Sequence, residues 1–108
     1  MEADAAILEV LQDVQRIERK YTRYRDDSVT SAINRAAGGH AVPIDAETLA
    51  LLRYADRCHR LSGGRFDITS GVLRRAWDFR REPPRMPIRD ELDATRALIG
   101  WERVEWSE

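Results

Sequence analysis

The chain has 108 residues, a length that predicts one domain or part of one. Hydrophobic residues make up 43% and charged residues 34%, which is typical of a soluble globular protein. The formal net charge of −1 excludes a general electrostatic attraction to nucleic acid or to membrane surfaces. No apolar run approaches the length of a membrane span, and no secretory signal opens the chain.

Three helices are predicted in the first part of the chain. Residues 4–21 carry apolar side chains at the i, i+3, i+4, i+7 spacing of an amphipathic helix. Residues 29–35 predict a short helix with Asp27 or Ser28 as its N-cap. Residues 46–61 predict a second long helix that Gly63 and Gly64 end.

The remaining elements are shorter and include the predicted strands. We expect brief extended segments at 42–44 and 66–68, a helix from Ser70 or Gly71 to Asp78, and a proline-rich surface loop at 80–88. Residues 89–99 predict a helix, and the partial alternation of 101–106 (WERVEW) predicts a half-exposed strand. One short strand cannot form a sheet, so the expected fold class is α+β, as a helix-rich portion of a larger domain or a chain that a partner completes.

The segment 61–79, LSGGRFDITSGVLRRAWDF, has the features of a nucleotide site. Gly63 and Gly64 allow a sharp turn and a close approach of the backbone to a ligand. Asp67 is an acceptor at the end of that turn, and Thr69 and Ser70 stand where the free N–H groups of a helix start suit phosphate. Capping of that helix is an equal alternative for Asp67. The segment matches neither a P-loop nor a dinucleotide fingerprint.

The other candidate residues carry weaker signals. Asp26 and Asp27 suggest a metal or ribose contact, although helix capping is the favoured interpretation. Tyr24 lies beyond the apolar stripe of the first helix, at a position where its ring can stack on a flat heterocycle. Cys58 is the single cysteine, which excludes an intrachain disulfide, and His59 at a helix end indicates a structural role. No catalytic residue and no metal ligand is assigned.

Three blocks of the chain follow one another in a recognisable order: KYTRYRDDSVTSAINRAAG, VPIDAETLALLRYADRCHRLSGGRFDITSGVLRRAWDF and IGWERVEW. In this order they resemble the FAD:protein FMN transferase family, also called the ApbE or thiamine-biosynthesis-lipoprotein family, and the resemblance covers residues 6–106. The resemblance implies a magnesium-dependent enzyme that cleaves FAD and transfers FMN to a threonine or serine hydroxyl of a target protein. The bond formed is a phosphoester, and AMP is released.

The resemblance also implies which residues contact FAD. The family's tyrosine before the Asp-Ser step corresponds to Tyr24. The family's three-residue contact corresponds to Arg65, Phe66 and Asp67, and Thr69 is added from its place at the helix start.

Two parts of the family pattern are not found in residues 1–108. These are the opening strand with its Met-Gly-Thr element and the later half, which holds the magnesium ligands. We therefore expect a partial domain whose magnesium ligands lie outside this chain and which is inactive alone. The alternative is a non-enzymatic remnant that acts as a helical protein-interaction or FAD-binding module.

Expected partners are FAD, a target flavoprotein subunit and a second copy of the chain through its apolar faces. Relatives are often periplasmic lipoproteins, but no lipobox is visible, so no localisation is assigned.

Overall fold

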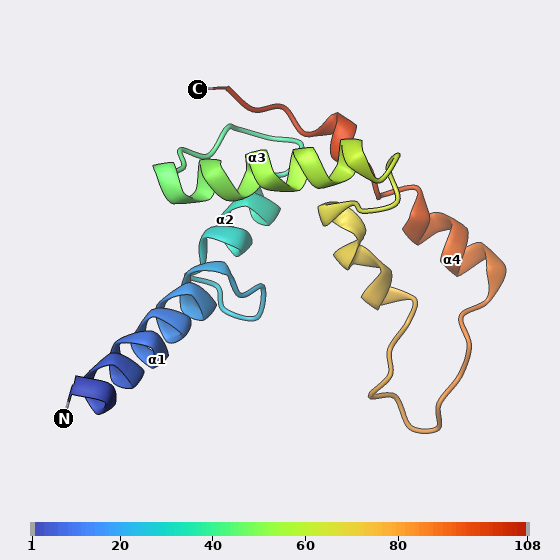
Figure 1. Cartoon of the computed structure of the whole chain (residues 1–108). Coiled ribbons are helices and arrows are strands. Elements are labelled where there is room, and N and C mark those ends of the chain that lie inside the picture. Colours follow the sequence, from blue (N-terminus) through green and yellow to red (C-terminus); the bar gives the residue numbers. More distant parts are fainter. Residues whose placement is uncertain (1, 108) are drawn as a thin grey trace. The chain divides into compact units, whose positions relative to one another are not determined.

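The structure, a computed structural model, describes residues 2–107. The regular secondary structure in that range consists of helices, which turns and loops connect. It divides into two compact units, one ending at Asp45 and the other beginning at Ala46, and each is described by itself. Figure 1 shows coiled ribbons and no strand arrows along the described part of the chain. In chain order the elements are α1 (Glu2–Tyr21), α2 (Val29–Ala36), α3 (Ala46–Leu61), the 3-10 helix η1 (Ile68–Arg75), α4 (Arg89–Arg96) and the 3-10 helix η2 (Trp101–Arg103).

The first unit contains α1 and α2. The prediction of α1 is confirmed, and its acidic first turn and basic last turn complement the helix dipole. The N-cap of α2 is Ser28, whose Oγ accepts a hydrogen bond from the backbone N–H of Ser31 at 3.1 Å. Thr30 Oγ1 donates to the backbone carbonyl of Tyr21 at 2.7 Å, so α2 is tied to the end of α1. This bond fixes the turn that carries Tyr24.

The second unit opens with α3, whose predicted bounds are confirmed. Gly63 and Gly64 have φ angles of +63° and +82°, values that glycine adopts without strain. Their N–H groups donate to the carbonyls of Arg60 at 3.2 Å and His59 at 2.8 Å, which is a Schellman C-cap. The predicted glycine stop is therefore confirmed, and the chain reverses over the last turn of α3.

The later helices differ from prediction in position and type. The predicted helix at 70–78 is the 3-10 helix η1, which starts earlier, at Ile68, because the Asp67 side chain caps it. The predicted helix at 89–99 ends as α4 at Arg96, and residues 97–99 form turns. Figure 1 shows η1 in yellow and α4 in orange, which contact each other and are joined by the predicted proline-rich loop at 80–88.

The expectation of an α+β fold with short strands is wrong for this structure, because residues 2–107 contain no strand. Residues 42–44 are non-helical without strand pairing, and WERVEW begins as the 3-10 helix η2. A strand is stabilised by ladder hydrogen bonds to a neighbouring strand, and the described residues supply no such neighbour. The backbone N–H of Trp101 instead donates to a side chain of the same unit.

The apolar interior of the second unit is small. Its buried apolar residues are Ala55, Ala76 and Trp101, and Trp101 is 5% exposed. Trp101 is the one large side chain among them, so it supplies most of the apolar surface that these three residues bury. No helix within residues 2–107 is both long enough and apolar enough to cross a membrane.

Candidate functional site

The Asp67 carboxylate organises the turn between α3 and η1. Its Oδ1 accepts hydrogen bonds from the backbone N–H of Thr69 at 2.8 Å and from Thr69 Oγ1 at 2.6 Å. Its Oδ2 accepts from the backbone N–H of Trp101 at 3.1 Å. Asp67 is therefore the N-cap of η1 and also anchors a segment 34 residues further along the chain.

These contacts change the acidity of Asp67, whose side chain is 11% exposed. Burial by itself raises the pKa, because it disfavours the charged carboxylate. The hydrogen bonds from Thr69 Oγ1 and from the N–H groups of Trp101 and Thr69, with the nearby His59, act in the opposite direction and prevail. The resulting pKa of Asp67 lies below its ordinary value, so this side chain is a stable anion in the folded chain.

Residues 100 and 101 are held by three hydrogen bonds, two to the start of η1 and its cap and one to α3. Besides the bond from Trp101 N–H to Asp67, the N–H of Gly100 donates to Thr69 Oγ1 at 2.9 Å. The indole Nε1–H of Trp101 donates to Asp56 Oδ1 on α3 at 2.9 Å. The Thr69 hydroxyl thus donates to Asp67 and accepts from Gly100, which links the two segments.

Arg65 and Phe66 lie at the outside of the turn. Both residues are exposed, Phe66 to 46%. The Phe66 N–H donates to Ser62 Oγ at 2.8 Å, which folds the backbone back on the end of α3. The turn therefore presents a cation and an aromatic ring to solvent from a backbone that side chains hold in place.

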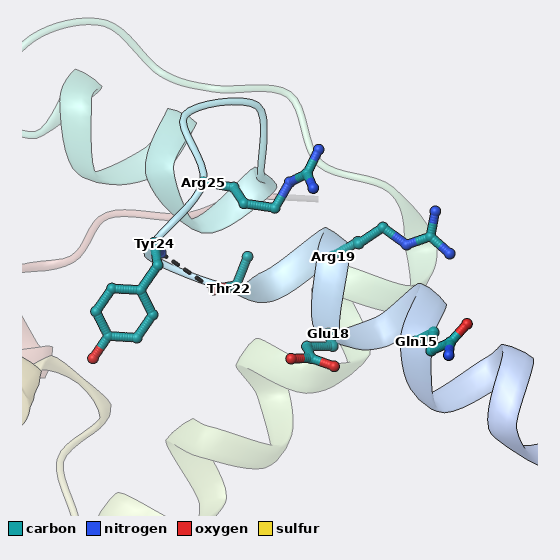
Figure 2. A pocket seen from close by; sticks show the side chains of 6 residues that line it. All are labelled: Gln15, Glu18, Arg19, Thr22, Tyr24 and Arg25. Carbon is teal, nitrogen blue, oxygen red and sulfur yellow. Dashed lines mark hydrogen bonds between the residues drawn. The ribbon is translucent and has the colours of Figure 1, made fainter.

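Of the five predicted FAD contacts, Arg65, Phe66 and Asp67 lie in this turn and Thr69 in the first turn of η1, whereas Tyr24 lies in the first unit. Tyr24 is 67% exposed and lines an open hollow of about 520 Å³ with Gln15, Glu18, Arg19, Thr22 and Arg25. Figure 2 shows this hollow, with the hydrogen bond from the Tyr24 N–H to Thr22 Oγ1 as a dashed line. The hollow combines an aromatic ring with two guanidinium groups.

One of these guanidinium groups has an acidic partner. Arg25 Nε and Nη2 donate to the two carboxylate oxygens of Asp27, each at 2.9 Å. The hydrogen bonds of this pair lower the pKa of Asp27 and raise that of Arg25. Asp27 therefore pairs with Arg25, and the predicted cap at this position is provided by Ser28.

The described residues do not fit a metal site by themselves. Within residues 2–107, no three side chains of His, Cys, Asp or Glu converge in a way that could hold a metal ion. The two oxygens of Asp67 accept hydrogen bonds from Thr69 and Trp101, and the ring of His59 faces a carbonyl. No step of a reaction through magnesium is therefore derived from this chain.

Three residues of the site were not predicted as part of it: Asp56, His59 and Trp101. The signal for His59 was its spacing of seven residues from Phe66 across the two glycines, since a chain that reverses at a Schellman motif returns over the last helical turn. Asp56 and Trp101 are 45 residues apart, and no local pattern connects them.

Comparison with known proteins assigns the chain to a family. The model of the ApbE family matches residues 2–108. Similar proteins named FAD:protein FMN transferase occur in Vibrio cholerae (30% identity, 94% of this chain, 32% of the relative), Chlamydia pneumoniae (29%, 84% and 29%) and Treponema pallidum (33%, 95% and 28%). The chain therefore spans about a third of the length of these relatives. On this evidence, and in agreement with the resemblance of its sequence blocks, the chain belongs to the ApbE family.

Proposed function

We propose that this chain is the FAD-contacting part of an enzyme that transfers FMN from FAD to a threonine or serine hydroxyl of a target protein. FMN is joined through a phosphoester bond, AMP is released, and magnesium bound by residues outside this chain assists. The name shared by the relatives supports the substrate. The observation that carries the proposal is the turn at residues 63–67. Its backbone is held by hydrogen bonds, and it presents the side chains of Arg65 and Phe66 to solvent.

The five predicted residues divide into two groups in this proposal. In the second unit, Phe66 offers an exposed ring for a flat ring system of FAD, and Arg65 offers a guanidinium for its phosphates. In the first unit, considered by itself, Tyr24 offers an exposed ring of the same kind. The side-chain oxygens of Asp67 and Thr69 already form hydrogen bonds within the chain. We assign these two to holding the turn.

We expect the chain to bind FAD and Phe66→Ala to weaken that binding by about fivefold. The reason is the loss of one exposed aromatic contact, worth roughly 0.5–1.5 kcal/mol. Quenching of flavin fluorescence during titration measures the affinity. Phe79→Ala is the matched control, because Phe79 is an aromatic residue of the same unit that is 87% exposed and lies outside the turn.

Equal effects of the two phenylalanine substitutions, or an unchanged FAD affinity in Phe66→Ala, contradict the assignment of Phe66.

A second prediction concerns the transfer reaction. Since the described residues gather no metal site, we expect no FMN transfer to a threonine-bearing peptide when the chain is given FAD and magnesium. Mass spectrometry of the peptide detects transfer, and a flavinylated peptide contradicts this part of the proposal.

A second candidate function is protein interaction through α1. No described residue of this 20-residue helix is buried. Its apolar side chains are 41–62% exposed: Ile7, Leu8, Val10, Leu11, Val14 and Ile17. A helix with one apolar face normally packs that face against another element, so a second copy of the chain is a fitting partner.

Sedimentation equilibrium of the chain tests this candidate. We expect concentration-dependent self-association that Val14→Glu shifts toward monomer by about tenfold or more in dissociation constant, because a charge then enters the apolar face. Gln15→Glu, which adds a charge at the neighbouring position that lines the hollow, is the control. A chain that remains monomeric at all concentrations rules out this role for α1.

A further inference from the structure

The ring of His59 lies against the turn that carries Arg65 and Phe66. His59 is in the last turn of α3, and its side chain is 14% exposed. The Nδ1 atom is 2.9 Å from the backbone carbonyl oxygen of Phe66. Because a carbonyl oxygen only accepts, Nδ1 must carry the proton of this hydrogen bond. The contact therefore fixes both the tautomer and the orientation of the ring.

The hydrogen bond to Phe66 is shorter than the distances from the His59 ring to its two neighbouring carboxylates. Nδ1 is 3.8 Å from Asp67 Oδ2, and Nε2 is 3.7 Å from Glu102 Oε1, both beyond hydrogen-bond length. A Cβ atom built on Gly64 would lie 3.6 Å from Cε1 of the ring. The ring thus lies beside the Gly64 backbone, at a distance at which an added Cβ would be in ordinary van der Waals contact with it.

Both polar groups of the Phe66 backbone are held from the end of α3. Its N–H donates to Ser62 Oγ at 2.8 Å, and its C=O accepts from His59. Loops otherwise sample several backbone conformations, and each residue that is held in advance lowers the entropy lost on ligand binding. The hydrogen bond from His59 holds the peptide plane that follows Phe66, and with it the backbone conformation of the turn.

We propose that His59 is a positioning residue for flavin nucleotide binding: its Nδ1–H holds the Phe66 carbonyl and so fixes the exposed Arg65 and Phe66 in the conformation that FAD meets. This role rests on the proposed function for the ligand, whereas the hydrogen bond itself belongs to the chain. His59 touches no ligand in this proposal and acts through the turn.

The test exploits the geometry of amide side chains. The amide nitrogen of asparagine occupies roughly the place of Nδ1, whereas that of glutamine reaches the place of Nε2. We therefore expect His59→Leu and His59→Gln to weaken FAD binding by about tenfold, the equivalent of one hydrogen bond, and His59→Asn to stay within about twofold of the original chain. A purely structural role of ring volume would not favour asparagine over the larger leucine and glutamine.

A second measurement separates this inference from the proposed function. Amide hydrogen exchange of residues 64–67 without ligand is expected to accelerate in His59→Leu and His59→Gln and to return toward the original rate in His59→Asn. If the original chain binds no FAD, the proposed function fails, and exchange alone decides whether His59 holds the turn. Equal exchange in all three variants, or equal FAD affinity in the asparagine and glutamine variants, overturns the inference.

Discussion

Replacement of Trp101 by alanine is expected to lower the free energy of unfolding of the second unit by about 3–5 kcal/mol, the usual range for a buried tryptophan. Trp101 is 5% exposed and is the one large side chain among the buried apolar residues described in this unit. Domains are stabilised by roughly 0.05–0.15 kcal/mol per residue, so the loss is comparable with the whole stability of a unit of this length. Urea denaturation followed by far-ultraviolet circular dichroism measures the change.

Two further substitutions test why Trp101→Ala lowers the free energy of unfolding. Trp106→Ala is the matched control, since Trp106 is 39% exposed and is expected to cost less than about 1.5 kcal/mol. Trp101→Phe keeps an aromatic ring but removes the indole N–H that donates to Asp56 and part of the buried ring system, so it is expected to cost more than the roughly 1 kcal/mol of that bond alone and less than Trp101→Ala. If Trp101→Ala costs no more than Trp106→Ala, the burial of Trp101 does not stabilise the unit.

Replacement of Asp67 by alanine is expected to cost about 2–3 kcal/mol near neutral pH. The substitution removes the cap of η1 and leaves the N–H of Trp101 without its acceptor. Asp67→Asn is expected to cost less, about 1–2 kcal/mol, because one amide oxygen can serve Thr69 or Trp101 but not both. Urea denaturation measures both variants, with Asp26→Asn as a control at an exposed aspartate of the first unit.

The effect of Asp67→Asn is expected to depend on pH. The folded chain holds the pKa of Asp67 below its ordinary value, so the carboxylate binds a proton less readily when folded than when unfolded. Its contribution is therefore fully present above the unfolded pKa of about 3.9 and is lost as the pH falls through the folded value. The stability difference between the original chain and Asp67→Asn should shrink in that acidic window. A difference that stays constant contradicts the assigned hydrogen bonds.

Local signals predicted the helices well where caps and periodicity agreed. The bounds of α3 and a cap of α2 at Asp27 or Ser28 follow from residues within a few positions of each end, and the structure assigns the cap to Ser28. The glycine pair at 63 and 64 likewise predicted the turn, because left-handed backbone angles favour glycine. Prediction failed for the strands, because alternation in WERVEW describes which side chains are apolar and not which backbone partner is present.

Local residue patterns were sufficient to predict the amphipathic helices, the Gly63–Gly64 turn and the family, because each depends on residues close together or on a pattern matched in order. The tertiary structure was needed to show what Asp67 does with its two oxygens, since the donor on Trp101 lies 34 residues away. It likewise brought His59 to the Phe66 carbonyl and the Trp101 indole to Asp56. Such contacts form between groups that the folded backbone brings within hydrogen-bond length, and local sequence patterns do not encode that distance.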